Sequence, residues 1–479
     1  MSGTARPLPA GTALRLRQCA DCGLTVRLSH AEPGVDWRCP RCDAVLRRHR
    51  ESPLVTPLAL AMTSLIFCIV TLTTPFLTLR LLGQMRVSHV ESGAYAFAHD
   101  GLWLLAALLV ATVVLVPLLR LSLRLAVLGG LTLRRPPPWL PQLLRAHQQL
   151  GAWSMLEVFL FGALVSYTRL ADLAEVEFGP AVYSLGAVVL AMVAADAAFE
   201  PQAAWDAMEA RGLMRAPHRR APQQRLPAGR PARGGPGEAP IACHCCHRVA
   251  PARPGDPCER CGTALHPRKP RSLQRAWALI IAASILYIPA NYYPVMSIVT
   301  LGQGGPHTIL GGVVEFVETG FWPLGLIVFL ASVAVPMLKL VGLIVMLVCV
   351  QRRSAWRLAG RTRLYRVIEV LGRWSMIDVF VVAVLIALVR FGVLASITAE
   401  VGAACFGAVV ILTMLAAEAF DPRLMWDAAG RNAPAIAPSA PLAPRRPPPR
   451  LRTPRRRCLR SNPKSSRRSR GAATSPGSG

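Results

Sequence analysis

The chain lacks the signatures of several functional classes. It contains no Gly-x4-Gly-Lys-Ser/Thr sequence, so ATP does not drive it through the phosphate-binding loop of nucleotide-driven pumps. It has no haem or flavin motif. The arginine-rich end after Asp427 carries no aromatic ring, on which single-strand nucleic-acid binders stack bases. Residues 1–50 are polar and hold cysteines, which predicts no cleavable signal peptide.

Apolar stretches, by contrast, are abundant. The chain is 53% hydrophobic with a mean hydropathy of +0.39, which is too apolar for an ordinary soluble protein. About 20 apolar residues cross a bilayer, and backbone groups have no water partner there, so such spans must be helices. The sequence predicts an all-α polytopic membrane protein with eight spans: 55–79, 102–128, 153–171, 179–199, 277–300, 321–350, 374–394 and 402–420.

Positive charge is scarce in the loops on one side of these spans. Loops 172–178, 301–320 and 395–401 hold no Lys or Arg, and loop 80–100 holds two arginines. Nearly all of the 54 basic residues lie in the alternate segments 1–54, 129–152, 201–276, 351–373 and 421–479. By the positive-inside rule these segments are cytoplasmic, and eight spans place both termini there.

The sequence also repeats itself. Cys39 recurs as Cys258 at an offset of 219 residues. Gly151-Ala-Trp-Ser-Met-Leu-Glu-Val-Phe159 recurs as Gly372-Arg-Trp-Ser-Met-Ile-Asp-Val-Phe380 at an offset of 221. We therefore expect two tandem four-helix repeats. Duplicated membrane modules commonly build one pathway between or inside their halves.

Eight cysteines form two sets with metal-ligand spacing. Each set has two Cys-x2-Cys pairs, and the sets are Cys19, Cys22, Cys39 and Cys42, and Cys243, Cys246, Cys258 and Cys261. Each pair aims two sulfurs at one point, and the loop between the pairs completes a tetrahedron. Cytoplasmic thiols stay reduced, which excludes disulfides. We expect two small four-cysteine ribbons, each holding structural Zn²⁺, with rubredoxin-like iron as the alternative.

Ionisable residues occur inside the predicted spans. Lys339 lies twelve residues before Gln351, about 18 Å along a helix from the cytoplasmic edge, and Arg120 is its counterpart in the first repeat. Such groups usually line a cavity or pair with a carboxylate. Two alternatives are that the long side chains snorkel and that the polar groups only lock helices together. The candidate substrate or coupling pocket comprises Lys339, Ser375, Asp378 and Thr413, with Arg120, Ser154 and Glu157 in the first repeat.

A second repeated pair lies at the outer end of the third span of each repeat. Arg169 and Arg390 occupy matched positions there. We expect both at the membrane interface, where they are candidate contacts for an anionic headgroup.

Four motifs resemble the paraquat-inducible protein A family. They are Ile288-Pro-Ala-Asn-Tyr-Tyr-Pro-Val-Met296, Gly320-Phe-Trp-Pro-Leu324, Gly372-Arg-Trp-Ser-Met-Ile-Asp-Val-Phe380 and Leu415-Ala-Ala-Glu-Ala-Phe-Asp-Pro-Arg-Leu-Met-Trp-Asp427. The resemblance covers about residues 15–430. The first repeat departs from the pattern, with Leu72-Thr-Thr-Pro-Phe76 where the second has Ile-Pro-Ala-Asn.

The resemblance implies a function as well as a fold. It implies a bacterial inner-membrane protein, not an enzyme, with two cytoplasmic zinc ribbons. Members pass phospholipid or a similar amphiphile between the inner membrane and a periplasmic tunnel protein built of mammalian-cell-entry (MCE) domains. By motif matching, the polar pocket again falls on Lys339, Ser375, Asp378 and Thr413. The outer loops are too short to hold an MCE domain, so that partner is a separate chain, and no nucleic-acid partner is expected.

Two other functions are compatible with the sequence. The first is a membrane redox or stress-response protein that uses rubredoxin-like iron in the cysteine sets. The second is a scaffold whose metal ribbons dock a cytoplasmic partner while the helices serve as an anchor.

These features predict a linear domain order. Its parts are an N-terminal tail (1–14), the first zinc ribbon (15–50), the first membrane module (54–206), a disordered Pro/Arg/Gly linker (207–240), the second ribbon (241–268), the second membrane module (275–428) and a disordered basic tail (429–479).

Overall fold

A computed structural model gives the arrangement of the chain. It describes residues 15–28, 36–48, 50, 52–81, 83–170, 175–214, 239–300, 303–318, 320, 322–391 and 395–430. The predicted tail 1–14, most of the linker 207–240 and nearly all of the tail 429–479 lie outside the described residues.

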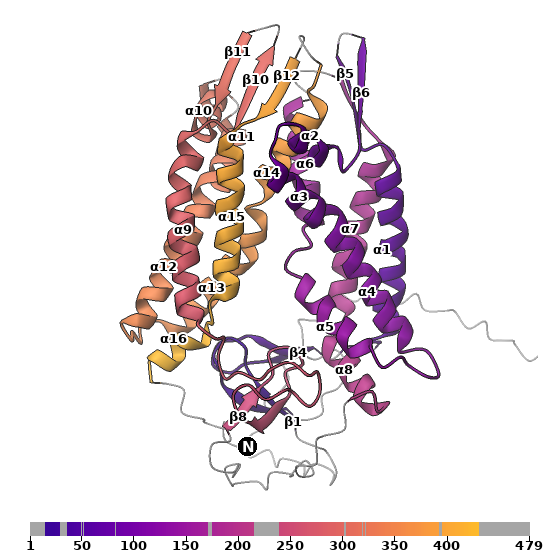
Figure 1. Ribbon diagram of the computed structural model, residues 1–479, viewed down its shortest axis with the longest axis vertical. Coiled ribbons are helices and arrows are strands. Elements are labelled where there is room, and N and C mark those ends of the chain that lie inside the picture. Colours follow the sequence, from indigo (N-terminus) through magenta and orange to yellow (C-terminus); the bar gives the residue numbers. More distant parts are fainter. Residues whose placement is uncertain are drawn as a thin grey trace, which may run out of the picture.

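Four apolar helices build the first half, drawn in indigo to magenta in Figure 1. They are α1 (Val55–Thr73), a continuous helix made of α3 (Trp103–Leu109), η1 (Val110–Leu115) and α4 (Val116–Gly130), then α6 (Leu156–Leu170) and α7 (Pro180–Ala198). Three short helices accompany them: α2 (Ser92–His99), α5 (Leu140–Leu150) and α8 (Pro201–Ala210). α1 packs along α7, which brings the first and last apolar helices of this half together.

The second half follows the same order. Its helices are α9 (Ser272–Tyr292), the continuous α11 (Trp322–Phe329), η2 (Leu330–Ala334) and α12 (Val335–Gln351), then α13 (Leu358–Trp374), α14 (Ile377–Leu388) and α15 (Val401–Ala419). Two short helices, α10 (Ile309–Glu318) and α16 (Arg423–Ala428), complete it. α9 packs along α15 as α1 packs along α7.

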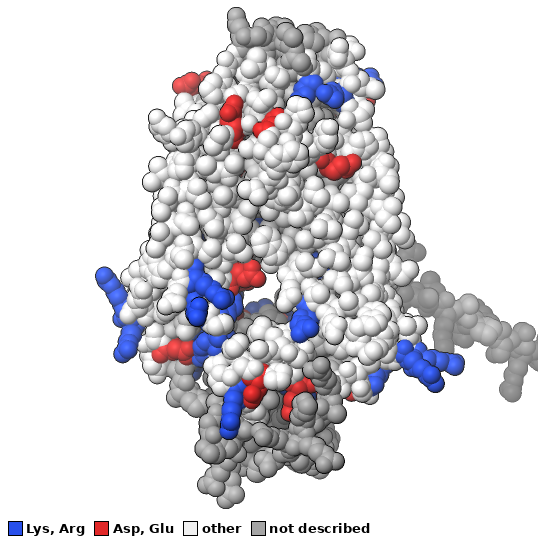
Figure 2. Space-filling view, viewed as in Figure 1, with Lys and Arg blue, Asp and Glu red and all other residues white. Residues whose placement is uncertain are grey.

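Seven helices among the described residues are long and apolar enough to cross a membrane: Val55–Thr73, Trp103–Gly130, Pro180–Ala198, Ser272–Tyr292, Leu330–Gln351, Leu358–Leu388 and Val401–Ala419. They overlap seven of the eight predicted spans. The eighth prediction, 153–171, corresponds to α6, which has 15 residues and extends only about 22 Å. Figure 2 shows charged side chains gathered toward the two ends of the molecule, with a largely uncharged band between them.

The prediction of an all-α protein is incomplete, because each half carries a three-stranded antiparallel sheet at the end opposite the ribbons (Figure 1). In the first half β5 (Leu77–Leu81) pairs with β6 (Gln84–Ser88) and β7 (Glu175–Phe178). In the second, β10 (Met296–Thr300) pairs with β11 (Gln303–His307) and β12 (Ala395–Ala399).

Proline explains why the predicted first spans of both repeats ran too far. The residue before a proline is disfavoured in the α conformation, so helices end there. Thr74, before Pro75, and Tyr293, before Pro294, are both extended, with ψ of 156° and 148°. The apolar runs therefore continue as β5 and β10 rather than as helix.

The prolines in the second helix of each half mark a different irregularity. A π-helical segment lies just before Pro117 in α4, and another just before Pro336 in α12. Proline lacks an N–H and clashes with the preceding turn, so a wider local turn accommodates it within a continuous helix.

The two halves meet through their third apolar helices. α14 packs against α6 and against α2 of the first half. The rings of Phe159 and Phe380 lie 5.7 Å apart at 76°, an edge-to-face contact worth about 1 kcal/mol. Ser166 donates to the carbonyl oxygen of Val381 at 3.2 Å. Buried residues of both halves form one continuous apolar core around this contact.

Candidate functional site

The first cysteine set lies in the turns of two hairpins. β1 (Arg15–Gln18) pairs with β2 (Thr25–Leu28), and β3 (Asp36–Arg38) pairs with β4 (Val45–Arg48). Gly23 donates its N–H to the Cys19 carbonyl at 3.0 Å, and Asp43 donates to that of Cys39 at 2.9 Å. Gly23 and Asp43 have φ of 73° and 59°. This left-handed geometry folds each Cys-x2-Cys pair back on itself.

The second set repeats this construction. β8 (Ala239–Ala242) pairs with β9 (Val249–Ala252) around the first two cysteines. His247 donates its N–H to the Cys243 carbonyl at 3.0 Å, and Gly262 donates to that of Cys258 at 2.8 Å. Both donors again have positive φ, 54° and 75°.

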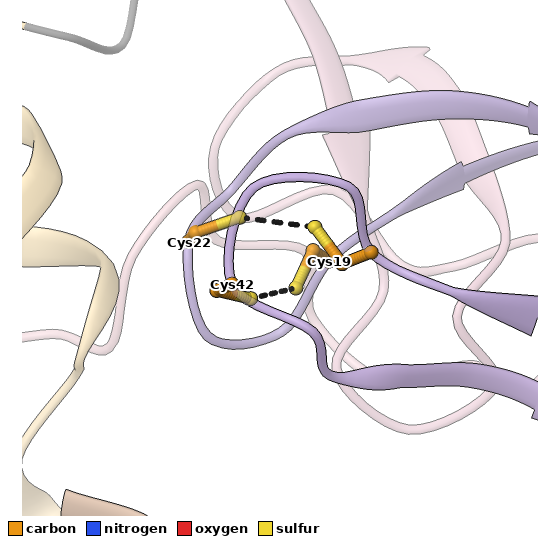
Figure 3. Close-up of side chains that lie close together, drawn as sticks. Cys19, Cys22 and Cys42 are labelled. Atoms are coloured by element: carbon orange, nitrogen blue, oxygen red, sulfur yellow. Dashed lines mark hydrogen bonds between the residues drawn. The ribbon is translucent and has the colours of Figure 1, made fainter. Parts of the chain in front are cut away.

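The sulfur positions fit a tetrahedral metal ion. Within each set all four Sγ atoms lie within 4.8 Å of one another and all four residues are buried. Cys19 and Cys42 are 3.5 Å apart at Sγ (Figure 3), as are Cys22 and Cys39. In the second set the corresponding distances are 3.4 and 3.5 Å. Ligands about 2.3 Å from Zn²⁺ at tetrahedral angles would lie about 3.8 Å apart. The two sets can therefore each hold one ion; the same four thiolates also suit iron.

Each ribbon packs against the half that does not follow it in sequence. The cysteines of the first ribbon share a buried cluster with residues of the second half, among them Ile280, Met346 and Trp426. Those of the second ribbon share one with Leu131, Leu144, Trp205 and other residues of the first half. The sequence alone did not predict this crossed docking.

The two docking contacts match. Arg366 in α13 donates to the carbonyl oxygen of Cys42 at 2.8 Å. Arg145 in α5, 221 residues earlier, donates to that of Cys261 at 3.3 Å. Arg366 also pairs with Asp21 at 2.6 Å. Cys245 occupies in the second ribbon the position that Asp21 has in the first, and its Sγ lies 3.4 Å from Gln148 Oε1 in α5.

Further ion pairs join the ribbons to both halves. Arg47 of the first ribbon pairs with Glu200 at 2.9 Å and with Asp206 at 3.2 Å, both in the first half. Arg260 of the second ribbon pairs with the same Asp206 at 2.5 Å. Arg268, the last residue of the second ribbon, pairs with Asp427 of the second half at 2.5 Å. The ribbons thus form a common base under both helical halves.

In the second half the structure brings Lys339 and Ser375 together. Lys339 is 1% exposed, and its Nζ lies 3.2 Å from Ser375 Oγ and 3.5 Å from the carbonyl oxygen of Gly372. Thr413 is fully buried in α15 and donates to the carbonyl oxygen of Val410 at 2.9 Å. Asp378 lies in the first turn of α14 and is partly buried. These residues come from α12, the α13–α14 junction and α15.

The matched residues of the first half are arranged differently. Arg120 lies near Gly151, as Lys339 lies near Gly372, but its Nη2 binds both oxygens of Asp196 at 3.0 Å. The Oγ of Ser154 is buried and has no hydrogen-bond partner in the described part of the chain. The first half therefore lacks the lysine-to-serine contact of the second.

Arg124 enlarges this polar cluster. It is 3% exposed, pairs with Asp196 and donates its Nε to His147 Nε2 at 3.1 Å. The residues at the matched positions of the second half are all apolar and buried: Leu343, Ile368 and Ala417. Charged residues within an apolar run can indicate a buried polar cluster of this kind. The sequence comparison of the two repeats did not reveal this one, because the second repeat has apolar residues at the matched positions.

Glu157 contacts the other half rather than its own. Its Oε1 lies 3.6 Å from Nη1 of Arg373, at the end of α13. Arg373 is two residues before Ser375, so Glu157 stands beside the lysine site of the second half. Trp374 lies with its ring 5.1 Å from that of Phe161 in α6. A contact between repeats cannot be read from a motif that recurs in each.

The outer arginines lie in α6 and after α14. Arg390 pairs with Asp100 of the first half at 2.5 Å and donates to the Ala96 carbonyl at 3.1 Å. Asp100 also accepts the N–H of Ala399 at 3.1 Å. This contact joins the halves at the sheet end. The side chain of Arg169 lies outside the described part of the chain.

Comparison with known proteins gives a consistent result. The sequence profile described as "Paraquat-inducible protein A" matches residues 54–209 and again residues 273–430. The chain is 35% identical over 412 residues to "Intermembrane transport protein PqiA" of Escherichia coli strain K12, covering 85% of this chain and 95% of that protein. It is 29% identical over 425 residues to "Lipophilic envelope-spanning tunnel protein A" of the same strain, covering 88% and 92%.

A further relative matches over a shorter stretch. "Probable intermembrane transport protein" of Haemophilus influenzae is 36% identical over 169 residues, covering 35% of this chain and 41% of that protein. No solved structure matches. The resemblance expected from the motifs is confirmed, and the chain belongs to the paraquat-inducible protein A family.

Proposed function

We propose that this chain is the inner-membrane subunit of an intermembrane lipid transport system. It passes phospholipid or a similar amphiphile between the inner membrane and a periplasmic tunnel protein made of MCE domains. The headgroup occupies a polar pocket formed by Lys339, Ser375, Asp378 and Thr413, and the acyl chains lie among apolar helices.

The observation that carries the proposal is the burial of Lys339. An ammonium group in the middle of a membrane-crossing helix is costly and is retained where it has a role. Lys339 is 1% exposed and its Nζ contacts are to Ser375 and Gly372. The relatives named as transport proteins support a transport function for this chain.

Orientation follows from charge. The ribbons and the basic loops between α4 and α5 and between α12 and α13 lie at one end of the molecule, which we place in the cytoplasm. The two three-stranded sheets then face the periplasm, where the MCE-domain partner would receive or deliver lipid.

We further propose that transport is coupled to protonation of Lys339 and Asp378. Removal of a proton from the lysine, or its addition to the aspartate, changes the charge of the pocket and so its affinity for a zwitterionic or anionic headgroup. The rate of transport by the reconstituted system should then depend on pH. A rate that is independent of pH would contradict this coupling.

The ribbons are proposed to hold structural Zn²⁺. Four thiolates fill a tetrahedral site and leave no open position for chemistry, so the ion's contribution is to folding. The redox alternative requires iron. A purified protein with two zinc ions per chain and no visible absorption supports the structural role, whereas a red protein would favour the redox alternative.

Photo-crosslinking in living cells tests the pocket. The Cγ of Met414 lies 4.0 Å from the point where a Cβ on Gly372 would lie, and the Lys339 side chain is equally close to that point. A photo-reactive residue at Met414 should capture phospholipid. The matched control is Val341, two residues from Lys339 on the same helix and 52% exposed.

Substitution distinguishes specific from bulk lipid. Capture at Met414 should fall at least several-fold in the Asp378→Ala background, whereas capture at Val341 should not change. Absent labelling at Met414, or labelling unaffected by Asp378→Ala, would contradict a lipid-binding pocket. Silent alanine substitutions at Lys339 and Asp378 in a transport assay would favour the scaffold alternative.

A further inference from the structure

A cavity of about 680 Å³ lies where the first ribbon meets the second helical half. It is lined by Arg41 of the ribbon, Trp426 of α16, and Ala355, Arg357, Leu358, Ala359 and Gly360 around the start of α13. None of these residues is a metal ligand or a member of the Lys339 pocket, and none is acidic.

The lining is suited to an anion. The Arg41 guanidinium carbon lies 5.2 Å from the centroid of the Trp426 ring, so the charge is held beside an aromatic face. Arg357, whose guanidinium lies 5.7 Å from the Trp356 ring, supplies a second positive charge. Two guanidinium groups from separate parts of the chain therefore border one cavity.

The start of α13 adds backbone donors. Leu358, Ala359 and Gly360 form the first turn, whose N–H groups have no acceptor within the helix. The residue before them, Arg357, makes no side-chain capping bond and has φ of 41°. The positive end of the helix dipole thus opens onto the cavity without a capping side chain.

A third arginine, Arg361, lies near the start of α13 but is not part of the cavity lining. Arg361 is 4% exposed and donates its Nη2 to the Ser354 carbonyl at 2.6 Å, next to Ala355 of the lining. Its Nε and Nη1 have no hydrogen-bond partner among the described residues. Buried N–H groups are nearly always satisfied, so these two require an acceptor that the described chain does not provide.

The position of the cavity indicates which anion the two lining arginines would meet. The candidate membrane span Leu330–Gln351 ends just before it. Trp356 is 63% exposed, and tryptophan favours the headgroup level of a bilayer. Exposed Arg352 and Arg353 lie between the span and this tryptophan. The cavity therefore lies level with the headgroups of the leaflet that borders the ribbons.

We propose that this cavity binds the phosphate of an anionic phospholipid in that leaflet, with Arg41, Arg357 and the first turn of α13 as donors. A soluble phosphate ester offers the same anion. The lipid is favoured because its acyl chains can lie along the exposed apolar surface of α12, as its headgroup enters the cavity. The site uses no residue of the Lys339 pocket, so a test of this site does not depend on whether the protein transports lipid.

Lipid retention by the full-length protein provides the test. The protein is placed in nanodiscs of phosphatidylglycerol and phosphatidylcholine, extracted in mild detergent, and its retained phosphatidylglycerol is counted by mass spectrometry. We expect Arg357→Asn and Arg41→Gln each to lower retention roughly fivefold, the effect of one arginine at an anionic surface. Arg363→Gln, an exposed arginine of α13 outside the cavity lining, should change nothing. Equal loss in all three variants, or no loss in any, would overturn the proposal.

Two further measurements separate folding and ligand source. Asparagine tolerates the left-handed conformation of residue 357, so Arg357→Asn should keep the wild-type melting temperature. Retention that remains at wild-type level in this folded variant counts against the site. Millimolar glycerol 3-phosphate should not displace the lipid. Binding of glycerol 3-phosphate by the wild type but not by Arg357→Asn, together with lipid retention that does not depend on Arg357, would identify a site for soluble phosphate esters and refute the lipid.

Discussion

Arg366 in the second half donates to the carbonyl oxygen of Cys42 in the first ribbon at 2.8 Å, across 324 residues of sequence. Its counterpart, Arg145 in the first half, makes the same contact with Cys261 of the second ribbon. The two ribbons are thus exchanged between the halves by an approximate two-fold relation. A ribbon that folds only around its ion links metal binding to the half it contacts.

This exchange predicts a crossed effect of metal loss. Cys19→Ser with Cys22→Ser should unfold the first ribbon and accelerate amide hydrogen exchange mainly in α12, α13 and α16 of the second half. The expected increase is roughly tenfold, or about 1.4 kcal/mol of local stability. Cys243→Ser with Cys246→Ser should act mainly on α4, α5 and α8 of the first half. Exchange that rises instead in the half following each ribbon in sequence would contradict the crossed docking.

Local patterns were read correctly from the sequence because their geometry is local. The spacing of Cys19, Cys22, Cys39 and Cys42 suffices to gather four sulfurs, since two tight turns do this without help from the rest of the chain. The apolar runs likewise predicted most of the helices. The strands after α1 and α9 were missed because hydropathy does not show where a run leaves the bilayer, although Pro75 and Pro294 mark the place.

Contacts between repeats could not be predicted in the same way. The first-half pocket was expected to mirror the second, with Glu157 near Arg120. In the structure Arg120 binds Asp196, and Glu157 lies 3.6 Å from Arg373 of the other half. A repeat shows which positions correspond but not how two copies pack. The helices that pack together between the halves, α6 and α14, carry no sequence pattern that identifies them as partners.

The serine at the lysine site predicts an asymmetry between the halves. Ser375→Ala removes the hydroxyl 3.2 Å from Lys339 Nζ and leaves the buried ammonium with the Gly372 carbonyl. We expect a loss of about 1–3 kcal/mol of stability, seen as a lower melting temperature in detergent. Ser154→Ala is the matched control, because its hydroxyl has no partner among the described residues. It should cost less than about 0.5 kcal/mol, and equal effects of the two changes would refute the contact.

Close packing between α6 and α14 makes Gly162 sensitive to size. A Cβ there would lie 3.0 Å from the Phe380 Cβ and 3.3 Å from the Ile377 carbonyl oxygen. Gly162→Val should therefore destabilise the joined halves by about 1–3 kcal/mol through overpacking. Gly186→Val in α7 serves as the control, since nothing lies within 4 Å of its Cβ position. Thermal unfolding checks both, and a tolerated valine at 162 would show that the halves are less tightly packed.

The aspartate after α15 predicts a dependence on acid pH. Asp421 is 1% exposed and accepts bonds from Arg423 Nε and Nη2 at 2.9 Å and from the Lys269 N–H at 3.1 Å. Burial alone would raise its pKa, but the bonds and charge of Arg423 outweigh burial, so the pKa lies below the usual 3.8. A carboxylate with a lowered pKa stabilises the fold fully above its unfolded pKa, and this contribution is lost as pH falls through the folded pKa.

Asp421→Asn should therefore cost about 2–3 kcal/mol at pH 7. The difference in melting temperature between variant and wild type should stay constant down to about pH 5 and shrink below the usual pKa of an aspartate. Because the variant and the wild type both release metal at acid pH, this effect cancels in the difference between their melting temperatures. Glu91→Gln, at an exposed position, should show no such difference at any pH. A gap that persists unchanged at about pH 3 would show that Asp421 does not lose its charge in the range expected for this carboxylate.

The charged cluster of the first half predicts that three substitutions are tolerated better than one. Asp196→Ala leaves Arg120 and Arg124 side by side without the carboxylate they share. Because Asp196 is 39% exposed and partly screened, the expected cost is about 2 kcal/mol rather than the larger value of a fully buried pair.

Replacing the cluster with its second-half counterparts should restore stability. Arg124→Leu, His147→Ile and Asp196→Ala together reproduce Leu343, Ile368 and Ala417, which pack there as buried apolar residues. In that background Arg120 lies near Gly151 as Lys339 lies near Gly372. The triple variant should then melt above Asp196→Ala and lie within about 1 kcal/mol of wild type, since well-packed apolar groups can replace a buried ion pair. If it melts below the single variant, the cluster is not interchangeable with the apolar packing, and the charges of the first half serve a purpose that the second half does not share.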